Sequence, residues 1–504
     1  MKLPLFSKKE EKKKKAETFD NELLEVDFFC QVAYMASIST SGISRSALFY
    51  RAAQLPYSAT RYFRRVDFVA KMFNHDYSQA CRIVGEKTKE SAIKAFLLRF
   101  SGALASGEEI TGFLSRESAI LSESFGNTYR RKLDLLKKWG DGYIALMLTP
   151  ALVAVMGVVT MMLGVSSMFF MASMIVLSIG SALVGAWFLY RTAPREVKNH
   201  SLPVHSKEQD FARNLSKLIL PVGVVVVLLL LFMRVDLGFV LIVVSAFLFP
   251  IGLVAMSDDR KVTKRDSDIA SFLRSVGGTM QAIGATAAEA ISRIDFRSLG
   301  TLKDEVGLLH NRLKAGIGAY SCWREFVQES GSELINRSVT TFWDGITLGG
   351  EPQQVGNEAS AFALKISLLR AERSQIATGF SWITIAMHMA LTGLVVFVYN
   401  VFLVFSELVQ GLTTESEGAV SSSALSNMPS FGLFGGNVDF IGDLHFMVII
   451  IVFILTIANA FSMYSVSGGH WRKIFFYLSV TAGISGIVYT LAPPMVNMLF
   501  GRMG

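Results

Sequence analysis

The segment SDDRKVTKRDSDIASFLRSVGG, residues Ser257–Gly278, opens a polar block that extends to Gly379 and has hydrophobic runs of membrane length on both sides. Within this block apolar residues recur every three or four positions, which is typical of amphipathic helices. One series is Ile269, Phe272, Val276, Met280 and Ile283, and another is Ile335, Val339, Phe342 and Ile346. We therefore expect a helical domain with its own core over 257–379.

The composition indicates a membrane protein, because 51% of the 504 residues are hydrophobic. Much of the net charge of +8 comes from the N-terminal tail, residues 1–19, which we expect to be disordered. This tail either follows the positive-inside rule or binds anionic lipid. Elsewhere basic and acidic residues alternate, so we expect no nucleic-acid binding. Three cysteines imply no disulfide framework.

Seven hydrophobic runs are each about long enough to cross a bilayer as a helix. They are Tyr143–Leu163, Ser166–Leu189, Leu218–Met233, Gly238–Met256, Phe380–Phe405, Phe446–Val466 and Ile474–Phe500. The sequence thus predicts an all-α membrane protein with about seven spans. Its expected parts are a first soluble helical domain over 20–140, four spans in two hairpins over 141–256, the second soluble domain over 257–379, and three spans over 380–504.

The distribution of lysine and arginine predicts the orientation of these spans. The connector Tyr190–Lys217 carries six basic residues, whereas no Lys or Arg lies between Ser374 and Trp471. Basic residues collect on the cytoplasmic side of membrane helices. We therefore expect both soluble domains and the N-terminus to be cytoplasmic, and the loop 407–444 and the C-terminus to be external.

The chain also contains an internal repeat at an offset of 243 residues. Phe100-Ser-Gly-Ala-Leu-Ala-Ser-Gly-Glu-Glu109 matches Trp343-Asp-Gly-Ile-Thr-Leu-Gly-Gly-Glu-Pro352 at an aromatic residue, two glycines and a glutamate. At nearly the same offset Gly42 faces Gly284, in a turn of small residues. The predicted architecture is a helical bundle followed by membrane helices, twice.

The matched glycine and glutamate residues allow two interpretations. A glycine between two helices suits a C-cap that needs positive φ, and a following glutamate suits the first turn of the next helix. Alternatively, Gly107, Glu108, Gly350 and Glu351 contact a partner directly. The residues alone leave both open.

Two tandem helical domains, each with a small-residue turn and an aromatic-x-Gly-x-x-x-x-Gly-Glu element and each running into membrane helices, resemble the F-domain platform proteins of type II secretion and type IV filament systems. The resemblance covers about residues 20–405, and the seven spans look more like the archaeal archaellum and pilus platforms. It implies a non-enzymatic subunit of the plasma membrane, without cofactor or metal, that acts as a homo-oligomer. The implied partners are a hexameric assembly ATPase, pilin-like or archaellin-like subunits and the lipid bilayer.

No catalytic motif stands out in the sequence. Gly85-Glu-Lys-Thr88 lacks the upstream glycine of a phosphate-binding loop, and His200 and His205 have no Cys or carboxylate at zinc spacing, so we expect a solvated connector there. None of the seven spans contains Asp, Glu, Lys or Arg, which disfavours the alternative of a transporter with parallel repeats. We expect His388 and Asn400 to make interhelical hydrogen bonds.

The candidate partner contacts are on the two soluble domains, because only these are large enough to meet a soluble hexamer. They comprise the repeated elements and the basic residues that flank the spans. The full set is Gly107, Glu108, Gly350, Glu351, Arg130, Arg131, Lys132, Arg260, Lys261, Lys264 and Arg265. A simpler role for the basic residues is to hold lipid headgroups.

Overall fold

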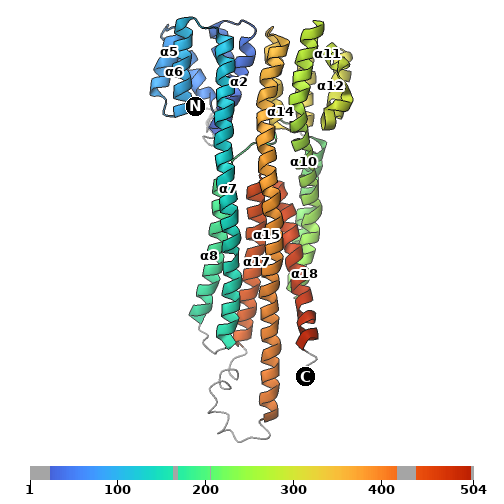
Figure 1. Ribbon diagram of the computed structural model, residues 1–504. Helices are drawn as coiled ribbons and strands as arrows, with labels where there is room; N and C mark the ends of the chain where they lie inside the picture. Colours follow the sequence, from blue (N-terminus) through green and yellow to red (C-terminus); the bar gives the residue numbers. More distant parts are fainter. Residues whose placement is uncertain (1–22, 163–167, 205, 417–438, 501–504) are drawn as a thin grey trace, which may run out of the picture. The chain divides into compact units, whose positions relative to one another are not determined.

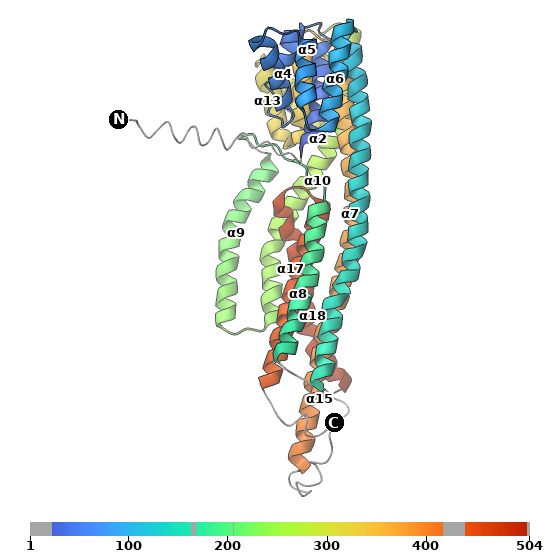
Figure 2. The ribbon, with the colours of Figure 1, turned by 90° about the vertical axis from the view of Figure 1, so that its left-hand side faces the viewer.

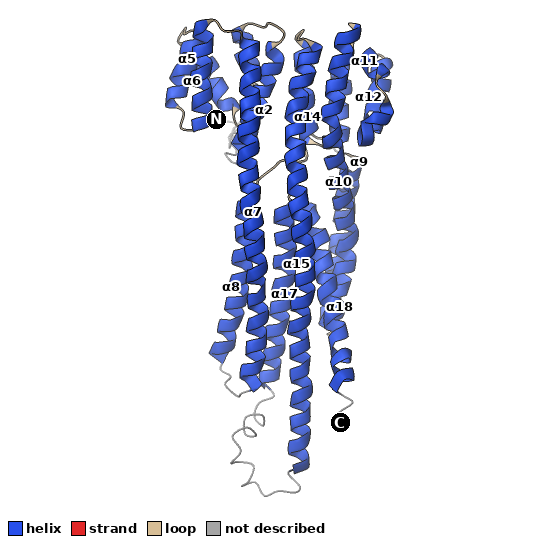
Figure 3. Cartoon of the chain, viewed as in Figure 1, coloured by secondary structure: helices blue, strands red, loops and turns tan. Residues whose placement is uncertain are grey.

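The computed structural model describes residues 23–162, 168–204, 206–416 and 439–500. These ranges consist of helices joined by loops (Figure 3) and contain no strand, only a single antiparallel bridge between Asn199 and Ser332. Seven of the described helices are long and apolar enough to cross a membrane. The prediction of an all-α membrane protein with about seven spans is confirmed. The tail 1–19 and most of the loop 407–444, namely 417–438, lie outside the described residues.

The chain divides into two compact units. One consists of residues 1–131, 195–207 and 260–371, and the other of 132–194, 208–259 and 372–504. The first unit thus combines both polar blocks with part of the connector between them. We call it the soluble unit, and the other the membrane unit. Three single helices, drawn as unbroken ribbons in Figure 1, belong partly to each: α7 (Ile110–Met162), α10 (Leu237–Ile283) and α15 (Pro352–Ser416).

The soluble unit contains two bundles built from the same series of helices. The first bundle consists of α2 (Leu24–Ser39), α3 (Arg45–Ala52), α4 (Thr60–Met72), α5 (Tyr77–Lys87), α6 (Ser91–Ser106) and the start of α7. The second consists of the end of α10, α11 (Ala287–Arg293), the 3₁₀ helix η2 (Phe296–Leu302), α12 (Lys303–Lys314), α13 (Ala319–Ser330), α14 (Glu333–Thr347) and the start of α15. Each helix of the first bundle therefore has a counterpart in the second.

The structure corrects the register of the repeat around its glycines. The left-handed residues after α6 and α14 are Gly107 (φ 74°) and Gly349 (φ 87°), which are 242 residues apart. In both turns the next backbone N–H bonds to the carbonyl five residues back: Glu108 to Ala103 at 3.1 Å, and Gly350 to Gly345 at 2.9 Å. The predicted offset of 243 is wrong here by one residue because the doublets Glu108-Glu109 and Gly349-Gly350 both fit a Gly-Glu match.

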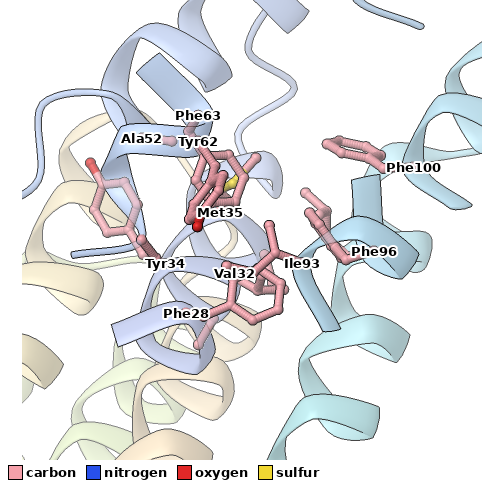
Figure 4. Close-up of a cluster of buried hydrophobic side chains, with 14 of the residues drawn as sticks. Phe28, Val32, Tyr34, Met35, Ala52, Tyr62, Phe63, Ile93, Phe96 and Phe100 are labelled. Carbon is pink, nitrogen blue, oxygen red and sulfur yellow. The ribbon is translucent and has the colours of Figure 1, made fainter. Parts of the chain in front are cut away.

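Each bundle has its own hydrophobic core. In the first, Phe28 of α2, Phe63 of α4, and Phe96 and Phe100 of α6 are buried and pack ring against ring (Figure 4). In the second, Trp323 of α13 fills the centre against Phe272 and Phe342. Burial of such large rings contributes about 2–3 kcal/mol each, so these aromatic clusters account for much of the stability of the bundles.

In the membrane unit α17 (Asp439–Ser467) packs against α8 (Met168–Thr192) and α18 (Ile474–Phe500). Helix α9 (Lys207–Phe232) precedes α10, and both are labelled in Figure 2. Glycines allow close backbone approach between α10 and α18, since a Cβ on Gly252 would lie 2.4 Å from the backbone of Phe476. Helix packing in membranes commonly relies on such small residues.

Polar side chains also join the membrane helices. The Nε2 atom of His388 lies 2.9 Å from Ser485 Oγ and 3.1 Å from the carbonyl of Thr481, and its Nδ1 atom lies 2.9 Å from Asn459 Nδ2. The Asn459 Oδ1 atom accepts a hydrogen bond from the Tyr143 hydroxyl at 2.8 Å. The predicted interhelical role of His388 agrees with these contacts. Asn400 differs, because its amide donates to the carbonyl of Val396 in its own helix.

The ends of the predicted loop 407–444 are helical. Helix α15 continues to Ser416 and α17 begins at Asp439. No proline interrupts residues 407–416, and Leu408, Val409 and Leu412 maintain a helical apolar spacing there. Only 417–438 separate the two helices.

Candidate interface on the paired bundles

The predicted contact residues fall into two groups at opposite ends of the soluble unit. Gly107, Glu108, Gly350 and Glu351 form the turns α6–α7 and α14–α15, which we call the tip turns. The basic residues lie at the other end. Arg130 is twenty positions beyond the start of α7 at Ile110, which corresponds to about 30 Å at 1.5 Å per residue. The candidate contact residues therefore lie on two separate surfaces.

The tip turn of the first bundle is open to solvent. Gly107 and Glu108 are both exposed, and a Cβ at Gly107 would meet nothing within 4 Å. The Glu108 carboxylate accepts a hydrogen bond from the guanidinium of Arg116, in the second turn of α7. Glu108 is thus oriented but accessible, as a contact residue would be.

The tip turn of the second bundle is packed instead. Gly350 is buried, and a Cβ there would lie 2.4 Å from Thr40 Oγ1 and 2.8 Å from the carbonyl oxygen of Gly345. Glu351 is half-buried and precedes α15, and its carbonyl accepts the N–H of Val355 at 2.9 Å. Close packing therefore explains Gly350, the left-handed cap is its neighbour Gly349, and Glu351 keeps partial exposure to solvent.

Five of the seven basic residues at the base are exposed. Arg130, Arg131, Arg260, Lys261 and Lys264 are exposed and Lys132 is half-buried. The Arg131 guanidinium donates to Thr128 Oγ1 at 3.1 Å.

Arg265 is only 8% exposed, forms an ion pair with Glu305 of α12, and donates to the carbonyl of Ser330 at 3.2 Å. Burial raises the pKa of the Glu305 carboxyl, and the charge of Arg265 opposes that shift. Arg265 therefore stabilises the second bundle and is not available to a partner.

A buried ionic cluster joins α2 to α14 and was not predicted from the sequence. Arg337 Nη1 donates to Asp27 Oδ1 at 2.7 Å, and Arg337 Nε donates to Glu333 at 2.9 Å. The other oxygen of Asp27 accepts from the backbone N–H of Ser58 at 2.8 Å, and the guanidinium lies 4.6 Å from the centre of the Tyr57 ring. Every charge is paired, as buried charges must be.

A second polar contact between the bundles lies further along the same helices. The Tyr34 hydroxyl donates to Asp344 Oδ2 at 2.8 Å, and Ser37 Oγ donates to the carbonyl of Thr341 at 3.0 Å. Burial raises the pKa of the Asp344 carboxyl, against the opposing effect of the Tyr34 hydrogen bond. Together with the Arg337 cluster, these contacts fix the register of α2 on α14.

Helices α7 and α15 meet at repeat-related positions. Lys365 Nζ binds Glu123 Oε1 at 3.0 Å, and these two residues are 242 positions apart. Ser115 Oγ donates to Glu358 at 2.5 Å in the same seam. Glu123 and Lys365 occupy the same position in the two copies of the repeat, so α7 and α15 contact each other there through equivalent residues.

The connector Arg195–Lys207 is fixed to the second bundle. The N–H of Glu333 donates to the carbonyl of Lys198 at 2.9 Å, and Arg370 donates to Glu196 at 3.0 Å and to Asp266 at 2.6 Å. His200 is only 3% exposed and bonds to the carbonyl of Gln328. The prediction of a solvated connector is therefore wrong at His200, whose ring is buried, and His205 lies outside the described residues.

The sequence contains few signs of these buried charged residues. Asp27 stands beside apolar residues, and Glu333 is four positions before Arg337, but nothing in the sequence pairs Asp27 with Arg337, which lies 310 positions further along the chain. Among the described residues no group of three or more His, Cys, Asp or Glu side chains is arranged to hold a metal ion. The arrangement is that of a packed scaffold with two exposed ends.

Comparison with known proteins gives two relatives, both called Flagella accessory protein J. The chain is similar to these flagella accessory proteins. The protein from Methanocaldococcus jannaschii is 27% identical over 317 residues, which is 59% of this chain and 55% of that protein. The protein from Methanococcus voltae is 22% identical over 454 residues, which is 86% of this chain and 78% of that protein. No family model and no solved structure matches the chain.

The two matches differ in how much of each relative they cover. The match to the Methanococcus voltae protein extends over most of both chains, while the match to the Methanocaldococcus jannaschii protein covers little more than half of that protein's length. With seven candidate spans, the chain is a multi-pass membrane protein similar to flagella accessory proteins.

Proposed function

We propose that this chain is the membrane platform on which an archaellum, or a related type IV filament or type II secretion-like machine, is assembled. The observation that carries this proposal is the similarity to Flagella accessory protein J over 86% of the chain. The doubled bundle is consistent with it, because two bundles joined by a buried ion pair and hydrogen bonds form a firm scaffold.

In this role the chain couples a hexameric cytoplasmic ATPase to pilin-like or archaellin-like subunits in the bilayer. It acts as a homo-oligomer in the plasma membrane, with both bundles and the N-terminus in the cytoplasm and the C-terminus outside. The basic connector and the absence of Lys and Arg between Ser374 and Trp471 support this orientation. The ATPase, not this chain, hydrolyses ATP.

The candidate docking residues are the accessible members of both groups. At the tip these are Gly107, Glu108 and Glu351, and at the base Arg130, Arg131, Lys132, Arg260, Lys261 and Lys264. Gly350 shapes the second tip turn without presenting a side chain. Because base and tip are about 30 Å apart, a single partner domain that contacts both must be large.

Deletion and complementation in the source cell test the proposal. We expect cells without this chain to lack surface filaments in electron micrographs, and an affinity-tagged copy to restore them and to co-purify with the assembly ATPase. Normal filaments in the deletion strain, with no ATPase recovered on the tagged protein, would refute the platform role.

The alternative of a transporter gains no support from the cavity between α9 and α10. This hollow of about 240 Å³ is lined by apolar residues such as Val227, Leu228 and Phe247. A transported polar solute needs polar groups at its binding site.

A further inference from the structure

Helix α4 of the first bundle carries an exposed stripe that combines arginines with large apolar side chains. Phe68, Met72 and the adjoining Phe73 are 55%, 68% and 63% exposed, and Arg64 and Arg65 on the same side are also exposed. We call these five residues the α4 stripe. Contiguous exposed apolar groups bordered by charge are typical of protein interaction sites.

The fold itself does not require this stripe. Helix α4 buries Phe63 and Val66 in its core, and its counterpart α12 buries Val306 and Leu309 at the same places. On the outer side, the positions equivalent to Arg64, Arg65 and Phe68 at an offset of 243 are Gly307, Leu308 and Asn311. One scaffold thus occurs twice in the chain, but at these three positions only the first copy carries two arginines and an aromatic ring.

The stripe is also distinct in charge. Helix α4 has four cations and one carboxylate, whereas α12 has three cations and two carboxylates. The one carboxylate of α4, Asp67, is already bound to Lys71 and to the hydroxyl of Tyr77, both at 2.9 Å. The outer face of α4 is therefore positive, and an acidic surface with apolar side chains is complementary to it.

The position of the stripe favours a protein over a membrane as its partner. Met72 and Phe73 lie at the tip end, since Asp76 just beyond them pairs with Arg45 at 3.9 Å, and Arg45 begins α3 after the left-handed Gly42. The same end holds the tip turn, where Thr111 bonds to the carbonyl of Ser39 at 3.1 Å. A membrane surface would be met by the base instead, about 30 Å away along α7.

The aromatic rings are placed for side-chain contacts and not for stacking on nucleic-acid bases. Phe68 and Phe73 pack edge to face, with ring centres 6.5 Å apart, and Phe73 stacks beside His75 with an angle of 24° between the rings. Single-stranded nucleic acids are usually bound on open aromatic faces. The exposed thioether of Met72 is instead an adaptable contact for apolar protein side chains.

We propose that the α4 stripe is the docking site for an acidic, partly apolar surface of the assembly ATPase, and that only the first bundle provides it. This inference rests on the proposed function, because that function supplies the partner. It adds a tip-end contact in which arginines steer the approach and Phe68, Met72 and Phe73 provide the apolar anchor.

Binding of the full chain, held in nanodiscs of uncharged lipid, to the purified ATPase of the same cell tests this inference. We expect Arg64→Glu with Arg65→Glu to weaken binding by roughly tenfold or more at low salt and to reduce its salt dependence. Phe68→Ser with Met72→Ser should weaken binding by roughly tenfold while leaving the salt dependence unchanged. The matched control Leu308→Ser, at an exposed position of α12, should bind like the unaltered chain.

Separate outcomes distinguish the two proposals. If the unaltered chain does not bind the ATPase, the proposed platform function fails. If it binds, and both double variants are folded in thermal melts and bind equally well, the α4 stripe is overturned as the docking site. Titration with anionic phosphatidylglycerol vesicles and with a DNA oligonucleotide completes the test. A loss confined to vesicle or DNA binding, with ATPase affinity unchanged, also overturns the inference.

Discussion

The two bundles share a series of helices but fill the space between them differently. In the first bundle, α2 carries Met35 and α7 carries Leu114. The equivalent positions in the second bundle, at an offset of 242, are Gly277 of α10 and Gly356 of α15. All four positions are buried. The first bundle is therefore held together there by side chains, and the second by direct approach of two helix backbones. The same fold is therefore packed in two ways at these positions. Removing side-chain atoms should destabilise the first bundle, whereas adding them should destabilise the second.

The largest effect is expected where the two bundles are joined. Arg337→Ala leaves Asp27 buried without its partner, so we expect a loss of about 3–5 kcal/mol in unfolding free energy. Arg312→Ala, which removes a more exposed ion pair with Glu325 and Glu329 within the second bundle, should cost only about 1 kcal/mol or less. Thermal melting of both variants, followed by tryptophan fluorescence, measures the difference. Equal losses of unfolding free energy in the two variants would contradict the larger stabilising role assigned to the buried Arg337 cluster.

The next effect separates the two packing solutions. A Cβ at Gly277 would lie 2.4 Å from the carbonyl oxygen of Pro352, so Gly277→Ala should destabilise by about 1–3 kcal/mol because two backbones must move apart. The neighbouring Gly278 has no atom within 4 Å of such a Cβ, and Gly278→Ala should stabilise α10 by up to about 1 kcal/mol. Melting temperatures that shift in the same direction for both variants would contradict the close approach.

A smaller effect compares a strained turn with a regular helix. Gly107 adopts φ 74°, so Gly107→Ala should cost about 1 kcal/mol although nothing obstructs the added methyl group. Gly102→Ala, within the preceding helix α6 and equally unobstructed, should be neutral or stabilising. Chemical denaturation of the two variants checks this, and a stabilising Gly107→Ala would exclude the left-handed cap.

The smallest effect depends on pH. The folded pKa of Asp344 lies above its ordinary value, so the stability linked to this group is greatest below that ordinary value and is lost as pH rises through the folded pKa. Asp344→Asn removes this loss and keeps an acceptor for Tyr34. We expect its melting temperature to match the unaltered chain in acid and to exceed it slightly at neutral pH. A constant difference between the two at all pH values would contradict the assignment.

The sequence allows the helices and spans to be predicted because periodicity and hydrophobic length act locally. The series at Ile269, Phe272 and Val276 indeed lies in the core of the second bundle. Side-chain partners depend on segments far apart in the chain, and Asp27 gives no indication that Arg337 will meet it. The register of the repeat was missed by one residue because doubled glycine and glutamate residues fit two alignments, which only backbone φ distinguishes. Likewise Arg265 has the same local pattern as its exposed neighbours, and only tertiary packing buries it.

The ion pair between Glu123 and Lys365 has a consequence for symmetry. In a dimer of identical chains, a residue beside the two-fold axis faces its own copy, so a charged residue there meets the same charge. Here both copies of the bundle belong to one polypeptide, and each can carry a different residue at the shared position. A repulsive contact thereby becomes an attractive one, and the pairing of the two halves is specified within a single gene product rather than by the meeting of two molecules.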